Sequence, residues 1–160
     1  MKPLYMIGCV NEIGKRQKAD NVSGLLGESG FREYMNQLDT PLETGYLLRI
    51  GIDHFKEIND NFGQEYGDFV LKKTAECISG CTSEGQKVYK LVADEFLILD
   101  VASDEAKDAD KLYDKVREAI DRFIETNEFK VMYTVSGGIV PFAALKGNQC
   151  SEALKLTDFA

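Results

Sequence analysis

The chain of 160 residues is 44% hydrophobic and 29% charged, which is typical of one soluble globular domain with its own core. Its formal net charge of -8 and its pI of about 4.7 argue against a nucleic acid partner, because binding to a phosphate backbone requires clustered Lys and Arg side chains. The N-terminal apolar run LYMIGCV is too short to cross a membrane, so no membrane insertion by this segment is expected.

The cysteine pattern argues against a zinc site and for a reducing compartment. No CxxC spacing occurs and His54 is the single histidine, whereas zinc ligands come in close Cys and His pairs. Buried free thiols are expected instead, and these are typical of the cytoplasm, where the protein or this part of a larger one is expected to lie. The four cysteines are Cys9, Cys77, Cys81 and Cys150.

The first third of the chain is predicted to contain a linker, a helix and a buried strand. Residues 1–19 combine a short apolar run with a basic linker, GKRQKAD. The punctuated stretch DNVSGLLG follows, and a helix is expected at about 28–38. Residues 45–52, GYLLRIGI, are predicted to form a buried strand that Arg49 interrupts.

The rest of the chain is predicted to alternate helices with strands. Residues 53–68 favour a short helical stretch followed by a glycine-containing loop, and another helix comes next. Its inner face is expected to contain Val70, Thr74, Cys77, Ile78 and Cys81. The runs KVYKLV and EFLILDV predict a hairpin with its turn at Ala93 and Asp94. An amphipathic helix at 109–124, a strand in FKVMYTVSGGIVPF and a helix in SEALKLTDFA complete the pattern.

This order of elements implies an α+β fold, with a mixed central sheet flanked by helices. No internal repeat or low-complexity segment interrupts it. The last helix is expected to be cut off by the chain end, as in a piece excised from a longer protein.

Several stretches of the chain resemble the motifs of one known family. They are DNVSGLLGESGF at 20–31, IDHFKEINDNFGQEYGD at 52–68, ADEF at 93–96 and YTVSGGIVP at 133–141. In this order and spacing they are similar to the GGDEF family, the diguanylate cyclase domains of bacterial cyclic-di-GMP signalling. The resemblance implies a domain at 20–160 with a palm-like βααββαβ sandwich, truncated at its C-terminal end.

The resemblance implies a reaction, a cofactor and catalytic residues. The family joins two GTP molecules into cyclic-di-GMP and releases pyrophosphate, within a head-to-tail homodimer. Mg²⁺ or Mn²⁺ would be the cofactor, because such a displacement needs divalent cations on the phosphates. Catalysis would fall to Asp94 and Glu95 of the signature. The metal would be held by Asp94 and the main-chain oxygen of Ile52, together with a carboxylate whose position is occupied here by Gly51.

Since Gly51 has no side chain, Asp53 is considered as a replacement ligand. Strand side chains alternate, which puts both residues on one face, but Asp53 lies about 7 Å further along at about 3.3 Å per residue. A magnesium bond is only about 2.0–2.1 Å long, so a local shift of register would be needed to bring Asp53 to the metal.

The resemblance also assigns the GTP-binding residues. Asn59 and Asp68 would read the guanine base through an amide and a carboxylate, although Asn and Asp also cap helices and turns. The backbone N–H groups of His54 and Phe55 would bind phosphates, with Lys56 beside them. The His54 side chain itself is expected at the surface.

The signature reads VADEF here, with Val92 and Ala93 where the family has glycines. Because a β-branched side chain resists positive φ, the turn is expected to take another shape, and Val92 is expected to fill space meant for substrate. The family's inhibitory RxxD motif falls on SEGQ at 83–86, so feedback through that site is not expected. The family's terminal Lys and Arg, which contact phosphates, would lie in a motif that starts around Phe159 and extends beyond the chain.

The favoured interpretation is a degenerate, catalytically inactive GGDEF domain that acts as a regulatory GTP-binding module. It would pass its nucleotide state to neighbouring domains of the PAS and EAL types. Residues 1–19 look like the last strand and exit linker of a PAS domain, although an unrelated strand and linker fits nearly as well. Two alternatives stay open: an active diguanylate cyclase that uses Asp94, Glu95 and a displaced Asp53, and a nucleotide-free dimerisation or interaction module.

Overall fold

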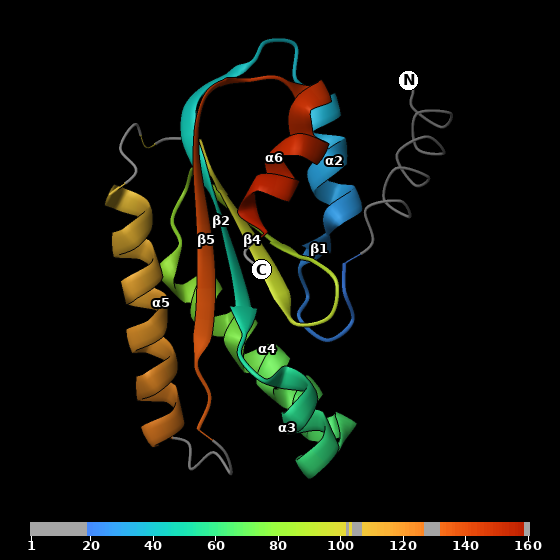
Figure 1. Ribbon diagram of the computed structural model, residues 1–160, viewed down its shortest axis with the longest axis vertical. Coiled ribbons are helices and arrows are strands. Elements are labelled where there is room, and N and C mark those ends of the chain that lie inside the picture. Colours follow the sequence, from blue (N-terminus) through green and yellow to red (C-terminus); the bar gives the residue numbers. More distant parts are fainter. Residues whose placement is uncertain (1–18, 102, 104–106, 127–131, 159–160) are drawn as a thin grey trace, which may run out of the picture.

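The computed structural model describes residues 19–101, 103, 107–126 and 132–158 (Figure 1). The proposed PAS linker at 1–19 therefore lies, except for Ala19, outside the described residues. None of the helices in the described part of the chain combines the length and the apolar character that a membrane span requires.

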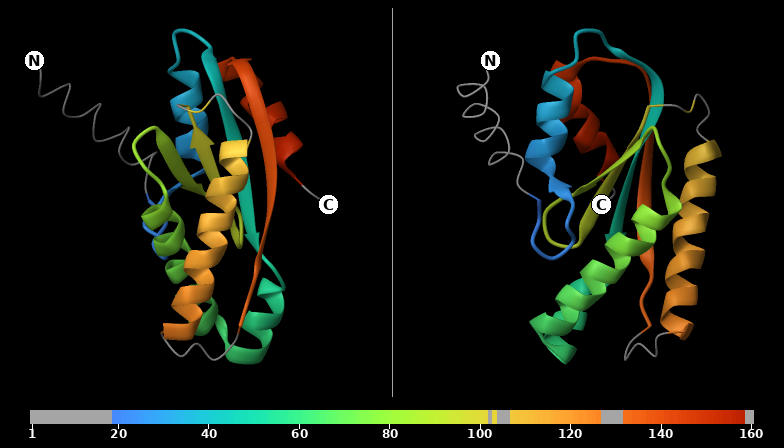
Figure 2. Two further views of the ribbon diagram at one scale, coloured as in Figure 1. Left: turned by 90° about the vertical axis from the view of Figure 1, so that its left-hand side faces the viewer. Right: turned by 180° about the vertical axis from the view of Figure 1, so that it is seen from behind.

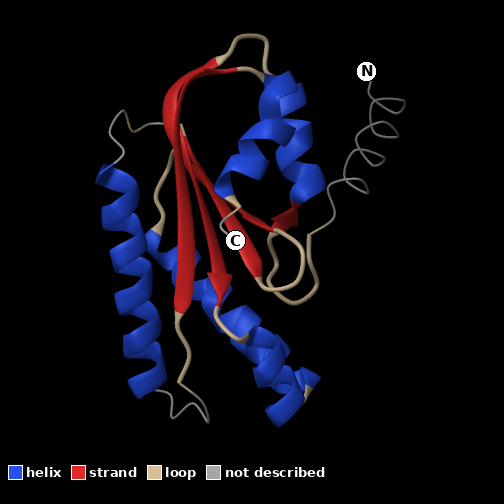
Figure 3. Ribbon diagram, viewed as in Figure 1, coloured by secondary structure: helices blue, strands red, loops and turns tan. Residues whose placement is uncertain are grey.

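A five-stranded mixed sheet forms the centre of the domain, in the order β1-β3-β4-β2-β5 (Figure 3). The strands are β1 (Leu26–Gly27), β2 (Leu42–Ile52), β3 (Gln86–Lys90), β4 (Glu95–Asp100) and β5 (Val135–Leu145). The short β1 pairs with β3 in parallel, and the other pairs are antiparallel. The long β2 thus lies between β4 and β5, and its register places Gly51 opposite Glu95 on one side and Ser136 on the other.

Helices cover both faces of this sheet (Figures 1 and 2). One face carries α2 (Glu28–Asn36) and α6 (Cys150–Thr157), the latter preceded by a short 3₁₀ turn, Gly147–Gln149. The other face carries α4 (Gln64–Cys81) and α5 (Lys107–Thr126), with α3 (Phe55–Phe62) packed against α4. This is the α+β arrangement that the pattern of elements predicts, a mixed central sheet flanked by helices.

The alternation of side chains along β2 determines which residues point to each face of the sheet. Leu48 and Ile50 belong to the core beneath α4 and α5, whereas Leu47 belongs to the core beneath α2 and α6. Because strand side chains alternate with period two, Arg49 and Gly51 share the face of Leu47. The end of β2 therefore presents its odd-numbered positions on the side of α6.

The predicted elements are confirmed, with corrections at their ends. The helix expected at about 28–38 is α2, and the strand expected at 45–52 begins three residues earlier, at Leu42. The final helix was expected to run to the chain end, but it ends at Thr157, and Asp158 has an extended backbone. The last strand begins at Val135, further along than the run FKVMYT suggested.

The glycine-containing loop expected within 53–68 is wrong, because α4 begins directly after Gly63. Gly63 has a φ of 90°, which ends α3 and lets α4 start without an intervening loop. Gly67 is a buried residue of α4, and a Cβ added to it would lie 1.7 Å from Asn59 Oδ1. This glycine therefore permits close approach of two helices and does not mark a break.

The described cysteines are free thiols, as the sequence predicts. Cys77 and Cys150 are buried and Cys81 is partly buried, while Cys9 lies outside the described residues. Burial raises the pKa of Cys77 to about 11, which keeps this thiol protonated and unreactive at neutral pH.

Candidate functional site

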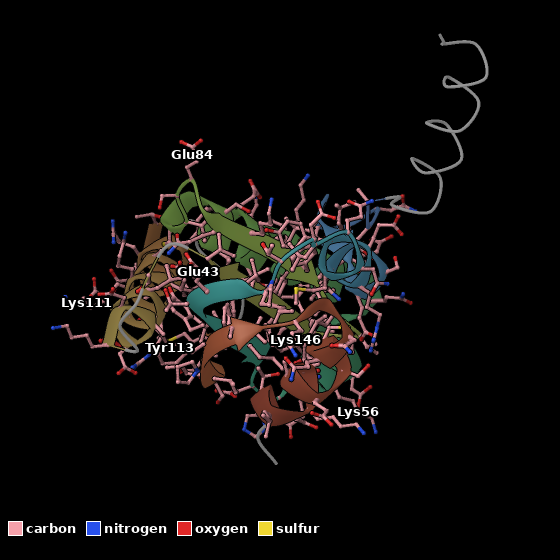
Figure 4. All side chains as sticks on the ribbon, turned by 90° about the horizontal axis from the view of Figure 1, so that it is seen from above. Glu43, Lys56, Glu84, Lys111, Tyr113 and Lys146 are labelled. Carbon is pink, nitrogen blue, oxygen red and sulfur yellow. The ribbon has the colours of Figure 1, made fainter. Side chains whose placement is uncertain are left out.

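A hollow of about 520 Å³ lies where the start of α3, the first turns of α4 and the β3–β4 turn meet. It is lined by Phe55, Lys56, Asn59, Gln64, Asp68, Leu71, Ala93 and Asp94. Residues that the sequence assigned to phosphate, base and metal binding are thus brought together from three separate segments. The side chain of Lys56 is exposed, and Figure 4 labels it at the edge of the molecule.

The start of α3 supplies backbone donors to this hollow. His54 has a left-handed backbone with a φ of 57°, which turns the chain sharply from the end of β2 into α3. The first N–H groups of a helix have no partner within the helix, and they lie at its positive end. The His54 side chain is 77% exposed and lies 3.6 Å from Glu57, so it belongs to the surface, as expected.

Asn59 and Asp68 lie on facing helices at the wall of the hollow. Asn59 Oδ1 is buried and has no hydrogen-bond partner within the described part of the chain. An unpaired buried acceptor costs about 1–3 kcal/mol, which a ligand N–H could recover after a small rotation of the amide. Asp68 is partly exposed, so its carboxylate remains accessible to a ligand.

The β3–β4 turn contains one non-glycine residue in the left-handed conformation, and Val92 avoids that conformation, as a β-branched residue is expected to do. Ala93 has a φ of 60°, and Val92, which is not at positive φ, has a side chain that is 76% exposed and does not line the hollow. The expectation that Val92 fills the substrate space is therefore wrong. Lys90 stabilises the turn, because its Nζ donates to the carbonyl oxygens of Leu91 and Ala93. These bonds offset the cost of about 1–2 kcal/mol for a non-glycine residue in this conformation.

Gly51 lies beside the two carboxylates of the signature. A Cβ added to Gly51 would lie 3.8 Å from Asp94 Oδ2 and 3.9 Å from Glu95 Oε2, both ordinary contact distances. There is room at this position for a side chain that the chain does not provide. Asp94 Oδ2 accepts a hydrogen bond of 3.1 Å from the Ile52 N–H, which ties the signature to the end of β2.

These residues do not fit a magnesium centre. Mg²⁺ requires near-octahedral oxygen ligands, usually with one or two carboxylates from the protein. In the residues that the structure describes, no group of three or more His, Cys, Asp or Glu side chains is placed to hold a metal ion. Position 51, at the end of β2 beside Asp94, is a glycine and offers no carboxylate.

Comparison with known proteins places this arrangement in a family. The model of the family "Diguanylate cyclase, GGDEF domain" matches residues 18–160. The chain belongs to the GGDEF family.

Individual relatives agree with this assignment. Diguanylate cyclase A of Treponema denticola is 31% identical over 98 residues, which cover 61% of this chain and 26% of that protein. The cyclic di-GMP phosphodiesterase NbdA of Pseudomonas aeruginosa is 29% identical over 141 residues, covering 85% of this chain and 18% of that protein. The chain spans well under half the length of the curated relatives that it matches.

The fold is shared with solved structures. The diguanylate cyclase SiaD of Pseudomonas aeruginosa, solved in complex with its activator SiaC, has a TM-score of 0.75 to this domain at 21% identity. That match covers 96% of this chain and 60% of SiaD. At this level of identity the likeness establishes the fold.

In this GGDEF domain, the carboxylate of Glu95 forms an ion pair with the side chain of Arg49. Arg49 Nη2 donates to Glu95 Oε1 at 2.6 Å, and Nη1 donates to Leu154 O at 3.3 Å and to Thr157 Oγ1 at 3.4 Å in α6. The Glu95 carboxylate is therefore held by the guanidinium, and Glu95 is not among the residues that line the hollow.

Asp53 is engaged elsewhere as well. Its two carboxylate oxygens accept hydrogen bonds of 2.6 Å from the hydroxyls of Thr134 and Ser136, at the start of β5. With His54 it lines a different hollow, of about 310 Å³, on the side of Met132 and Tyr133. Asp53 and Asp94 thus line different hollows, and the carboxylate of Asp53 is bonded to the start of β5.

Three residues of the site were missed or left unexplained by the sequence. Gly67 was read as part of a loop, and nothing near it in the sequence marks its contact with Asn59. Lys90 carries no local signal for its bonds to the turn. Arg49 did give a signal, since a lone charge in an apolar strand needs a buried partner, but the pattern did not show which one.

The charge on Asp94 is expected to reduce the stability of this domain at neutral pH. Burial of the carboxyl group, together with the nearby charge of Glu95, raises the pKa of Asp94 above its ordinary value of 3.8, despite hydrogen bonds from the Asp94 and Ile52 N–H groups. A raised folded-state pKa means that the folded protein binds protons more readily than the unfolded chain, so stability falls as pH rises through this range.

Asp94→Asn should therefore raise the free energy of unfolding at pH 7 by about 0.5 kcal/mol, a small value because the site is partly solvated. The gain should shrink as pH falls, and it should vanish below the ordinary pKa of 3.8, where both states are protonated. Thermal unfolding at a series of pH values measures it. Asp60→Asn, the same change of an acid to an amide at an exposed position of α3, serves as control.

Proposed function

We propose that this domain is a regulatory module that binds GTP and does not synthesise cyclic-di-GMP. The observation that carries the proposal is a contrast within one site. The groups suited to the base and phosphates line a common hollow, whereas position 51 has no carboxylate and Glu95 is paired with Arg49. GTP binding and cyclase catalysis depend on different residues here, so catalysis can be lost while GTP binding remains.

The phosphate side of the hollow favours GTP binding. Backbone N–H groups at a helix start attract anions through their free donors and the helix dipole. Phe55, which lines the hollow, and the preceding His54, which lines the neighbouring hollow of Asp53, would supply these donors. The exposed Lys56 would add a positive charge at the rim. Because the donors belong to the main chain, the changes of side chain in this domain leave them intact.

The base side of the hollow favours guanine over adenine. Guanine offers an N1–H and an N2–H₂ group as adjacent donors, and the Asp68 carboxylate and Asn59 Oδ1 are acceptors. Adenine presents an acceptor at N1 where guanine has a donor, so it would leave a carboxylate unpaired. Sites built to pair with a donor reject ligands that lack it by large factors.

The loss of cyclase chemistry follows from the cations that the reaction needs. Divalent cations neutralise the triphosphate and acidify the attacking hydroxyl. Asp94 and the Ile52 main-chain oxygen would remain as ligands for Mg²⁺ or Mn²⁺, but Gly51 removes the second carboxylate. The segment Ser83–Gln86 also lacks the arginine of the family's inhibitory motif, and Gln86 instead donates to Asp100 Oδ2 at 2.8 Å.

As a regulatory module, the domain would signal through its neighbours. We propose a cytoplasmic location, a homodimer in the full-length protein, and PAS and EAL domains next to this one in the chain. Nucleotide binding would then change the activity of an EAL phosphodiesterase domain. Since the chain spans only part of its relatives, this wider role concerns the longer protein.

Calorimetric titration with GTP and with ATP tests the proposal, alongside incubation of the full-length protein with GTP and Mg²⁺ or Mn²⁺. We expect saturable GTP binding, at least about tenfold tighter than ATP binding, and no cyclic-di-GMP by mass spectrometry. Asp68→Ala should remove most of the preference for GTP. Formation of cyclic-di-GMP would establish the active cyclase instead, and absence of GTP binding would establish the nucleotide-free interaction module.

A further inference from the structure

Arg49 is a charged residue in the middle of the central strand. Its neighbours Leu47, Leu48 and Ile50 are fully buried, and its own side chain is only 17% exposed. Burying a charge costs free energy unless the charge is paired, so the partner of Arg49 indicates the role of Arg49. That partner is Glu95, the fourth residue of the signature, at 2.6 Å.

The position of this ion pair relates it to the missing metal ligand. Arg49 and Gly51 lie two residues apart on the same face of β2, about 7 Å along the strand. Glu95 is directly opposite Gly51 in the β2–β4 ladder, and a Cβ at Gly51 would lie 3.7 Å from Glu95 Cγ. The guanidinium therefore neutralises a carboxylate at the place where a divalent cation would have to be bound.

Lys90 adds a second fixed cation near the other carboxylate. Its side chain is buried, and its Nζ is held by the carbonyl oxygens of Leu91 and Ala93 in the signature turn. The charge of Lys90 acts on Asp94 and favours its ionised form. Each carboxylate of the signature thus has a positively charged side chain nearby: Arg49 beside Glu95, and Lys90 near Asp94.

We infer that Arg49 supplies to Glu95, from within the protein, the positive charge that a divalent cation would otherwise bring to this carboxylate, so that GTP binds in the neighbouring hollow without Mg²⁺ and the signature disfavours metal binding. This inference rests on the proposed function, because it concerns the carboxylates beside the hollow, which Asp94 lines and Glu95 does not. A guanidinium balances charge but has no open coordination position, so it cannot acidify an attacking hydroxyl. The presence of a guanidinium in place of a divalent cation therefore explains how GTP binding can persist where cyclase catalysis does not.

Calorimetric titration of GTP in EDTA and in Mg²⁺ tests the first half of the inference. We expect the two dissociation constants of the unchanged protein to agree within about threefold. Weakening of about tenfold or more in EDTA would overturn the inference. If GTP binds in neither condition, the proposed function fails, and the following metal titration still decides the role of Arg49.

Titration with Mn²⁺ alone, followed by electron paramagnetic resonance, tests the second half in the absence of nucleotide. We expect Gly51→Asp to bind Mn²⁺ at least about tenfold more weakly than Gly51→Asp/Arg49→Met, because the guanidinium repels the ion and retains Glu95. Equal affinities in the two variants, or no binding in either, would contradict the inference. If Gly51→Asp/Arg49→Met does not fold, Gly51→Asp/Arg49→Gln takes its place, because glutamine keeps a hydrogen-bond donor without the charge, and it should bind Mn²⁺ more tightly than Gly51→Asp.

Arg32→Met is the matched control for loss of an arginine that ties α6 to the domain. Arg32 pairs with Glu28 at 2.8 Å and donates to Ser151 Oγ of α6 at 2.7 Å, away from the signature. Its removal should change neither the effect of EDTA on GTP binding nor the Mn²⁺ affinity of Gly51→Asp. If the role of Arg49 were purely structural, Arg49→Met and Arg32→Met would have the same effect on the Mn²⁺ affinity of Gly51→Asp.

Discussion

Gly67→Ala is expected to weaken GTP binding by about tenfold or more while leaving the domain folded. A Cβ at position 67 would lie 1.7 Å from Asn59 Oδ1 and 2.9 Å from Asn59 Cγ, but 3.4 Å from the Phe55 ring. The severe collision is with the end of one side chain, so Asn59 would rotate out of place before the backbone moved. The base would then lose one of its two readers. Titration with GTP and thermal unfolding of the same variant measure both effects.

Gly80→Ala is the matched control, because it adds the same methyl group to the same helix, α4. A Cβ there would meet nothing within 4 Å. GTP affinity should be unchanged, and stability should rise by up to about 1 kcal/mol because alanine favours a helix over glycine. If Gly67→Ala binds GTP as well as Gly80→Ala does, Asn59 does not read the base.

The contrast between these two glycines shows how far local sequence could predict the fold. The alternating and helical patterns of apolar residues were enough to locate the strands and helices, because burial repeats along an element. A glycine, however, has the same local appearance whether it ends a helix, as Gly63 does, or lets two helices approach, as Gly67 does. Only the partner distinguishes them, and for Gly67 that partner lies on another helix.

The site shows the same limit. Family motifs identified the residues of the hollow, but the ion pair of Arg49 with Glu95 joins residues 46 positions apart through the β2–β4 ladder. The conformation of Ala93 was not predicted, because the hydrogen bonds that Lys90 donates to the turn leave no local signal in the sequence. Interactions across the sheet thus determine how the signature turn and its Glu95 carboxylate are held.

Asp53→Ala is expected to lower the free energy of unfolding by about 2 kcal/mol, from two lost hydrogen bonds to a charged acceptor at a partly exposed position. These bonds come from Thr134 and Ser136, and the Asp53 N–H also donates to Thr134 O at 2.9 Å. Together they fix the end of β2 against β5, immediately before the left-handed residue His54. The melting temperature should fall by about 4–8 °C, and GTP affinity should fall with it, because the start of α3 loses its anchor.

Asp53→Asn separates this anchoring role from that of a metal ligand. An amide can accept from one hydroxyl and donate to the other, so asparagine should restore most of the stability and most of the GTP affinity. A metal ligand depends on its negative charge, so in an active cyclase with a displaced Asp53 the asparagine variant would be as impaired in Mn²⁺ binding as the alanine variant. The two substitutions therefore decide whether this carboxylate holds a strand or an ion. The hydrogen bonds to β5 favour the strand.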